Sequence, residues 1–92
     1  MAGIQIDVFG KVQGVFYRAS TVHFASKAGL AGTVQNMNDG SVRIRAFGKE
    51  EALLSLIEWS KEGPPSAVVD YIVLNDVEEH DAPVSFYTVY GE

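Results

Sequence analysis

The chain has 92 residues, which is enough for one domain with a single core and too few for a second lobe. Its 12 acidic and 7 basic residues give a net charge of -5, which argues against nucleic-acid and membrane-surface binders, since both need a positive face. The absence of cysteine excludes disulfides, zinc–thiolate sites and cysteine nucleophiles, and it is typical of a reducing compartment. We therefore expect residues 1–92 to form one domain, a cytoplasmic monomer that can still bind a small anion at a local positive site.

The first predicted elements are a strand and a helix. Alternating apolar residues over 3–9 predict a strand with one buried face. Small and apolar residues at helical spacing predict a helix over residues 19–28. Ser20 or Thr21 is expected to cap its start, and Gly29 is expected to end it in a left-handed conformation.

A hairpin is expected next in the chain. Residues 32–36 and 41–47 both have the character of strands. Between them Asp39 is followed by Gly40, and this pair is among the strongest signals for a tight turn. The two strands should therefore pair antiparallel.

The most regular helical pattern covers residues 49–62. One stripe of this helix is expected to face the core, with Leu54 widening it; the stripe consists of Leu53, Leu56, Ile57 and Ser60. The glycine and two prolines at 63–65 end the helix, because proline cannot continue the hydrogen-bond ladder.

Two further strands are expected over residues 68–77 and 85–90. The resulting order is βαββαβ with a short extra C-terminal strand. This order predicts an α+β fold, a ferredoxin-like βαββαβ sandwich with two helices on one face of a mainly antiparallel sheet.

The stretch GKVQGVFYR at residues 10–18 lies between the first predicted strand and the first predicted helix. Backbone N–H groups at a helix start lack helical partners, and a curved loop beside them can form a nest for an anion. Gly14 permits the positive φ that a nest needs, and the planar guanidinium of Arg18 can bind two oxygens of one phosphate. The residues alone leave two readings open: a phosphate cradle, or a common turn followed by a solvated arginine.

The same stretch resembles the signature G-x-V-Q-G-V-x-F-R of the acylphosphatase family, with Tyr17 in place of the phenylalanine. A second element of the family, G-W-V-x-N followed by a turn and D-G, resembles GTVQNMNDGSV at 32–42. The stretch EGPPSAVVDYIVL and the closing FYTVY are also similar to family elements, and all of them occur in the family's order. The resemblance thus covers essentially the whole chain.

This resemblance implies hydrolysis of acyl phosphates, the mixed anhydrides of carboxylic and phosphoric acids, by a ferredoxin-like enzyme. It implies a small-molecule acyl phosphate as substrate and inorganic phosphate as product, with no nucleic-acid or membrane partner. We expect no cofactor and no metal, because the loop amides and an arginine can supply the positive field.

The resemblance also implies a role for particular residues. Arg18 falls on the phosphate-binding arginine, and Asn36 falls on the asparagine that orients the attacking water. The backbone N–H groups of the phosphate-binding loop fall on Gln13, Gly14, Val15, Phe16 and Tyr17. The chain departs from the family's pattern at Thr33, where tryptophan is usual.

Two functions without hydrolysis are the alternatives. One is a catalytically silent ferredoxin-like module that binds an anion or a partner. Domains similar to the family also occur at the start of larger hydrogenase-maturation proteins. The other is an RNA-binding domain, which the net charge of -5 disfavours. The presence of both Arg18 and Asn36 favours the enzyme, because binding alone does not need the asparagine.

His23, and His80 with its acidic neighbours, are expected to be solvated surface residues and not metal ligands.

Overall fold

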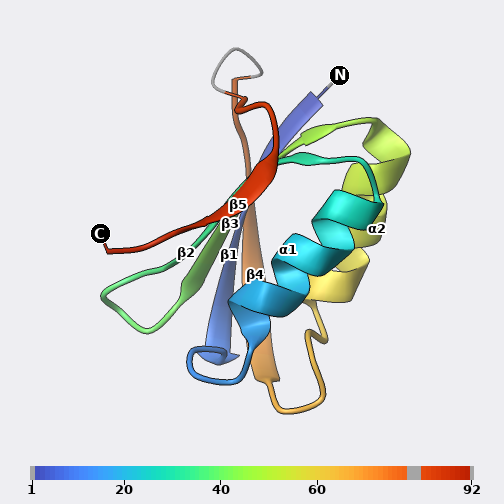
Figure 1. Cartoon of the computed structure of the whole chain (residues 1–92). Helices are drawn as coiled ribbons and strands as arrows, with labels where there is room; N and C mark the ends of the chain where they lie inside the picture. Colours follow the sequence, from blue (N-terminus) through green and yellow to red (C-terminus); the bar gives the residue numbers. More distant parts are fainter. Residues whose placement is uncertain (1, 79–81, 92) are drawn as a thin grey trace.

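A computed structural model describes residues 2–78 and 82–91 of the chain. Within these ranges a pair of helices covers one face of a five-stranded sheet (Figure 1). The elements are β1 (Ala2–Lys11), α1 (Tyr17–Lys27), β2 (Ala31–Asn36), β3 (Val42–Gly48), α2 (Glu50–Ser60), β4 (Val68–Asp76) and β5 (Phe86–Val89). His80 lies outside the described residues. None of the helices in the described ranges is both long and apolar enough to span a bilayer.

The strands follow the order β4-β1-β3-β2-β5 across the sheet. β3 pairs antiparallel with both β1 and β2, so β1 and β2 run parallel with β3 between them. β4 pairs antiparallel with the free side of β1, which completes the predicted ferredoxin-like arrangement. The short extra strand β5 pairs parallel with β2 and forms an edge of the sheet. The predicted fold class is therefore confirmed, and β5 makes the sheet mixed.

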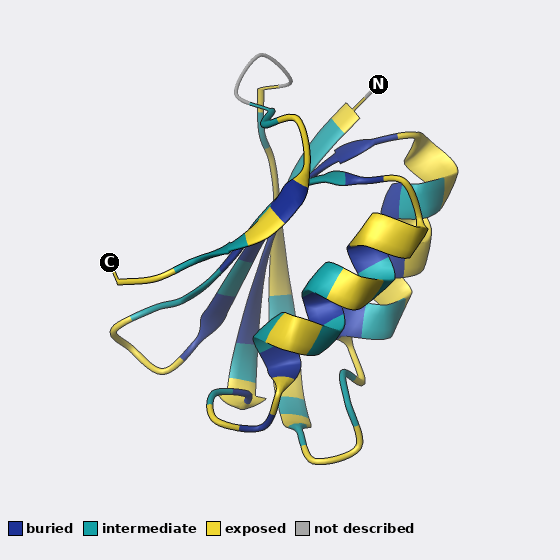
Figure 2. Ribbon diagram, in the orientation of Figure 1, coloured by how far each residue is buried: buried dark blue, intermediate teal, exposed yellow. Residues whose placement is uncertain are grey.

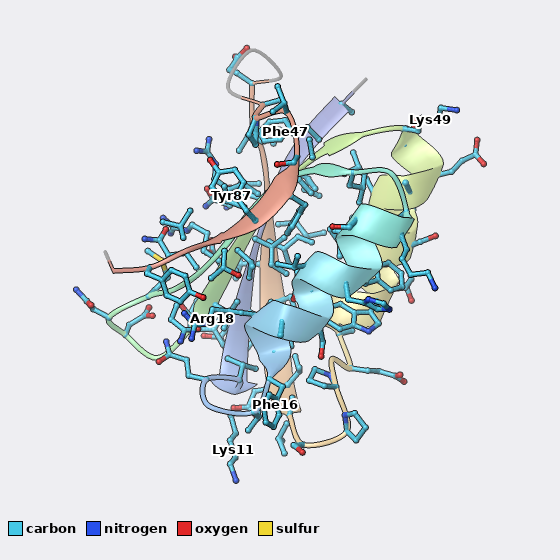
Figure 3. All side chains as sticks on the ribbon, viewed as in Figure 1. Lys11, Phe16, Arg18, Phe47, Lys49 and Tyr87 are labelled. Carbon is cyan, nitrogen blue, oxygen red and sulfur yellow. The ribbon has the colours of Figure 1, made fainter. Side chains whose placement is uncertain are left out.

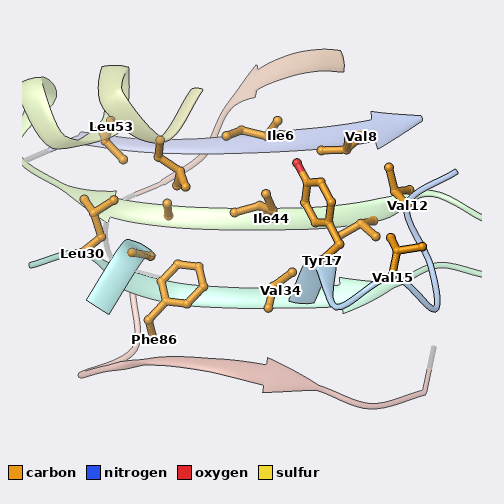
Figure 4. Packing of buried hydrophobic residues seen from close by; sticks show 14 residues of the cluster. Ile6, Val8, Val12, Val15, Tyr17, Leu30, Val34, Ile44, Leu53 and Phe86 are labelled. Carbon is orange, nitrogen blue, oxygen red and sulfur yellow. The ribbon is translucent and has the colours of Figure 1, made fainter. Parts of the chain in front are cut away.

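The core lies between the sheet and the helices. Figure 2 shows buried and intermediate residues along the central strands β1 and β3, and Figure 4 shows the layer that the buried ones form. Its fully buried members include Ile6, Val8, Val34, Ile44 and Leu56. Burial of apolar side chains stabilises a domain by roughly 25 cal/mol per Å², so this layer holds both helices on the sheet.

The stripe predicted for α2 is confirmed: Leu53, Leu56 and Ser60 are buried, and Ile57 is partly buried against the core. The expectation for Leu54 is wrong, because its side chain is 55% exposed. Neighbouring side chains of a helix are about 100° apart around its axis. Because Leu53 faces the core, Leu54 points away from it.

The capping expected for α1 is also wrong. The helix begins at Tyr17, and its N-cap is Phe16, with no capping side chain. Thr21 lies inside the helix and donates its hydroxyl proton to the carbonyl of Tyr17 at 2.8 Å. The loop backbone starts this helix, and not a Ser or Thr side chain. At the other end Gly29 has a φ of 77°, as predicted.

Candidate functional site

The loop between β1 and α1 has an unusual backbone. Gly14 has a φ of 74° and Phe16 a φ of 64°, both left-handed. Phe16 is the only residue other than glycine with a positive φ in the described ranges, and its side chain is 79% exposed. A bulky side chain makes this conformation costly, and such strain is concentrated at functional sites. Left-handed residues separated by an ordinary one turn successive N–H groups toward a common centre, which is the geometry of an anion nest.

Side chains on both sides of the nest fix this loop. Val12 and Val15 are buried in the core. The Gln13 side-chain amide donates to the carbonyls of Met37 at 2.8 Å and Ser41 at 2.9 Å. Both acceptors lie in the connection between β2 and β3 that follows Asn36. Gln13 therefore ties the loop to the strand end that carries Asn36, a role of its side chain that sequence reasoning missed.

Tyr17 anchors the other end of the loop to α2. Its ring is buried, and its hydroxyl donates to the carbonyl of Ser60 at 2.7 Å. In a continuing helix that carbonyl would accept from residue 64, but Pro64 has no N–H. Burial raises the pKa of Tyr17 above its usual range, so the phenol stays protonated and keeps donating. Gly63 passes so close that an added Cβ would lie 2.4 Å from the Tyr17 ring.

A cleft of about 290 Å³ opens beside the loop. Its lining residues come from the loop, the first turn of α1, β2 and the C-terminal segment; they are Val12, Gly14, Phe16, Tyr17, Arg18, Ala19, Asn36, Thr88 and Tyr90. Of the residues predicted for the site, Arg18, Asn36, Gly14, Phe16 and Tyr17 are brought together here. Gln13 and Val15 do not line the cleft, because their side chains point to the hairpin and the core.

Arg18 reaches the cleft from the first turn of α1. In Figure 3 it leaves the helix on the side where the strands lie, whereas Phe16 and Lys11 lie at the foot of the loop. Its Cζ atom lies 5.2 Å from the centroid of the Tyr90 ring, a cation–π distance. No carboxylate within residues 2–78 and 82–91 forms an ion pair with Arg18, so its donors can serve an anion.

Tyr90 was not predicted as a site residue. It lies 72 positions beyond Arg18 in the chain, and the only signal was the aromatic character of the closing FYTVY. The Gln35 side chain of β2 donates to the backbone carbonyl of Gly91, which holds the segment with Tyr90 beside the cleft.

Asn36 is the last residue of β2 and shares the helix-facing side of the strand with Val34. Its side-chain Oδ1 is buried and has no hydrogen-bond partner among the residues that the structure describes. A buried acceptor without a partner is costly, unless a water or ligand satisfies it. Asn36 itself lines the cleft, so its side-chain amide lies beside a molecule bound there.

The β2–β3 connection is itself well ordered by hydrogen bonds. Asp39 Oδ1 accepts from the Ser41 hydroxyl at 2.6 Å and from the Ser41 N–H at 2.9 Å. These bonds, the hydroxyl first, hold the pKa of Asp39 below its ordinary value of 3.8. The carboxylate thus fixes Ser41, whose carbonyl accepts from Gln13.

Two other predicted features lie away from this cleft. Thr33 alternates with buried Gly32 and Val34 and is in register with Arg45 and Tyr87, so it lies on the sheet face opposite the helices. His23 is exposed on α1. Over residues 2–78 and 82–91, no three acidic, histidine or cysteine side chains gather as a metal-ligand set.

Comparison with known proteins identifies the family of the chain. The sequence model of the acylphosphatase family matches residues 4–88. The chain belongs to the acylphosphatase family. It is 45% identical over 83 residues to an acylphosphatase of Marinobacter nauticus, covering 90% of each chain. It is 40% identical to an acylphosphatase of Hahella chejuensis, covering 90% of this chain and 88% of that one.

Solved structures give the same result for the fold. The crystal structure of acylphosphatase from Bacillus subtilis superposes with a TM-score of 0.93 at 39% identity. That superposition covers 98% of this chain and 100% of the other. The chain is thus an enzyme of the acylphosphatase family with the family's ferredoxin-like fold.

Proposed function

We propose that the chain hydrolyses acyl phosphates to a carboxylate and inorganic phosphate. The observation that carries this proposal is one cleft lined by the left-handed loop residues, by Arg18 and by the side chain of Asn36. Arg18 forms no ion pair with a carboxylate among the described residues. Family membership supports the same reaction class. We also propose that residues 1–92 act as one domain and as a cytoplasmic monomer.

The phosphoryl group is bound by the loop and by Arg18. Backbone N–H groups from Gln13 to Tyr17 point to its oxygens, and the Arg18 guanidinium binds two of them. Both remain in place as negative charge redistributes on these oxygens in the transition state, so they stabilise it without reorganisation. The Tyr90 ring holds the guanidinium over the cleft. Because these groups supply the positive field, the proposed reaction uses no metal.

Asn36 orients the attacking water. Its side-chain amide hydrogen-bonds the water, whose oxygen then attacks phosphorus in line with the bond to the acyl oxygen, and the water's protons pass to the phosphate product and to solvent. That P–O bond breaks, and its electron pair leaves with the carboxylate, which needs no strong general acid. A neutral amide suits this position because a carboxylate there would repel the phosphate.

The test is hydrolysis of benzoyl phosphate with excess chelator present. Arg18→Ala should lower kcat/KM on the order of 10³-fold or more, and Arg18→Lys should restore only a fraction of it, because lysine lacks the planar fork. Lys27→Ala, which removes an exposed cation from the last turn of the same helix, is the matched control and should retain native turnover.

Asn36→Ala separates the enzyme from a silent binding module. It should lower kcat more than it raises KM, because the water is the main group that Asn36 holds. Native kcat in a folded Asn36→Ala variant would refute the water-orienting role. Phosphate binding without turnover by the native chain would refute hydrolysis and assign the chain to the anion-binding modules.

A further inference from the structure

A second hollow lies on the other side of the first turn of α1. It is a groove of about 450 Å³ between this turn and the segment that follows α2. Its walls are Ala19, Ser20, His23, Phe24, Trp59, Gly63, Pro64 and Pro65. No acidic residue, lysine or arginine lines it, so the groove suits a neutral and largely apolar group.

The groove is preformed by aromatic packing. The Trp59 ring stacks on Phe24 with centroids 5.4 Å apart and planes 19° apart. Trp59 also contacts the ring of Tyr17 at 5.3 Å, and its carbonyl accepts from the N–H of Gly63 at 2.8 Å. A ligand would therefore meet rigid walls and would not need to order them, which favours binding.

The groove adjoins the phosphate cleft. Ala19 lines both hollows, so at this point they are separated by a side chain that is a single methyl group. α1 packs against β2 and β5 on one side and against α2 on the other (Figure 1). An in-line attack by a water on Asn36 of β2 directs the leaving group away from β2. The acyl group then leaves the phosphorus toward the first turn of α1 and the groove beyond it.

We propose that this groove binds the apolar chain of the substrate's acyl group, and this inference rests on the proposed acyl phosphate hydrolysis. The preferred substrates are then acyl phosphates with a neutral aliphatic or aromatic acyl group of about four to eight carbons, as the groove's size and walls suggest. Acetyl phosphate, with one methyl group, is too short to reach past Ala19. An acyl group that carries a charge is not stabilised by these apolar walls.

The expected gain follows from the apolar area that the groove removes from water. A fully buried methylene contributes about fourfold to binding, and one in a groove open on one side contributes about twofold. From acetyl to hexanoyl phosphate, four added methylenes should raise kcat/KM about tenfold or more.

The first test compares acetyl, butanoyl and hexanoyl phosphate on three chains. With the native protein, kcat/KM should rise with the length of the acyl chain. Ser20→Gln places a longer polar side chain in the groove and should flatten the ratio of hexanoyl to acetyl phosphate. Ser26→Gln makes the same change on an exposed position of α1 outside the groove, and should keep the native ratio.

A second readout does not depend on turnover. Trp59 is the only tryptophan in the sequence, so its fluorescence reports on the groove. Titration with hexanoate at saturating inorganic phosphate should change this emission at concentrations where acetate does not, and Ser20→Gln should weaken the response.

The outcomes separate the two proposals. Hydrolysis of acetyl phosphate with no rise along the series, or a rise that survives Ser20→Gln, would refute the acyl groove and leave the proposed function intact. Absence of turnover for every member of the series would refute the proposed function, and the acyl groove with it.

Discussion

Tyr17→Phe tests whether α2 anchors the loop between β1 and α1, which is the proposed phosphate-binding loop. The substitution removes only the hydroxyl that donates to the Ser60 carbonyl at 2.7 Å. Ser60 is fully buried, and Pro64 cannot supply an N–H in place of the phenol. Leaving a buried acceptor without its donor costs about 1–2 kcal/mol of unfolding free energy.

For a domain of this size each kcal/mol corresponds to about 4–8 °C in Tm, so we expect a decrease of about 4–16 °C. Urea unfolding followed by circular dichroism should show a lower midpoint with an unchanged slope. The matched control is Tyr71→Phe, which removes a hydroxyl from a side chain that is 57% exposed and should change stability by less than about 0.5 kcal/mol. Equal midpoints for Tyr17→Phe and the native chain would refute this account of the anchor.

Three further predictions concern the groups around the cleft. Gln13→Glu should lower kcat/KM more than Gln13→Ala, because the carboxylate would be repelled by the two carbonyl oxygens that now accept from the amide. Equal decreases of kcat/KM in the two variants would contradict this. Tyr90→Leu should raise the Kd for inorganic phosphate about two- to fivefold, and Tyr90→Phe should not, because the ring and not the hydroxyl contacts Arg18. Because the folded pKa of Asp39 lies below 3.8, its contribution to stability is present above that pH and is lost as pH falls through the folded value. Acid unfolding scans should therefore show that Asp39→Ala loses less stability than the native chain as pH falls. Parallel curves of stability against pH for the two chains would contradict this linkage.

The order of the elements could be predicted because period-2 and helical patterns alternate cleanly along the chain. The turn at Asp39 and Gly40 and the proline-rich end of α2 mark clear boundaries. The exceptions lie where two local rules compete. Leu54 is apolar but sits next to the residue that takes the core position. Ser20 and Thr21 are good capping residues, but Phe16 starts the helix from the loop.

The candidate site was only partly predictable, for a different reason. Arg18 and Asn36 belong to elements with recognisable motifs, and the fold brings them to one cleft. The left-handed Phe16 could not be predicted from residue type, because bulky residues avoid that conformation. The contact of Tyr90 with Arg18, and that of the Tyr17 hydroxyl with Ser60, depend on side-chain placement across distant segments. Local sequence patterns carry no information about such contacts.

The most direct test of the central claim is the fate of the attacking oxygen. Benzoyl phosphate is hydrolysed by the native chain in water labelled with heavy oxygen, with chelator present, and both products are analysed by mass spectrometry. In-line attack on phosphorus by the water on Asn36 predicts the label in inorganic phosphate and none in benzoate. Label in benzoate would mean attack at the carbonyl carbon, and it would contradict the assignment of the cleft to phosphoryl transfer.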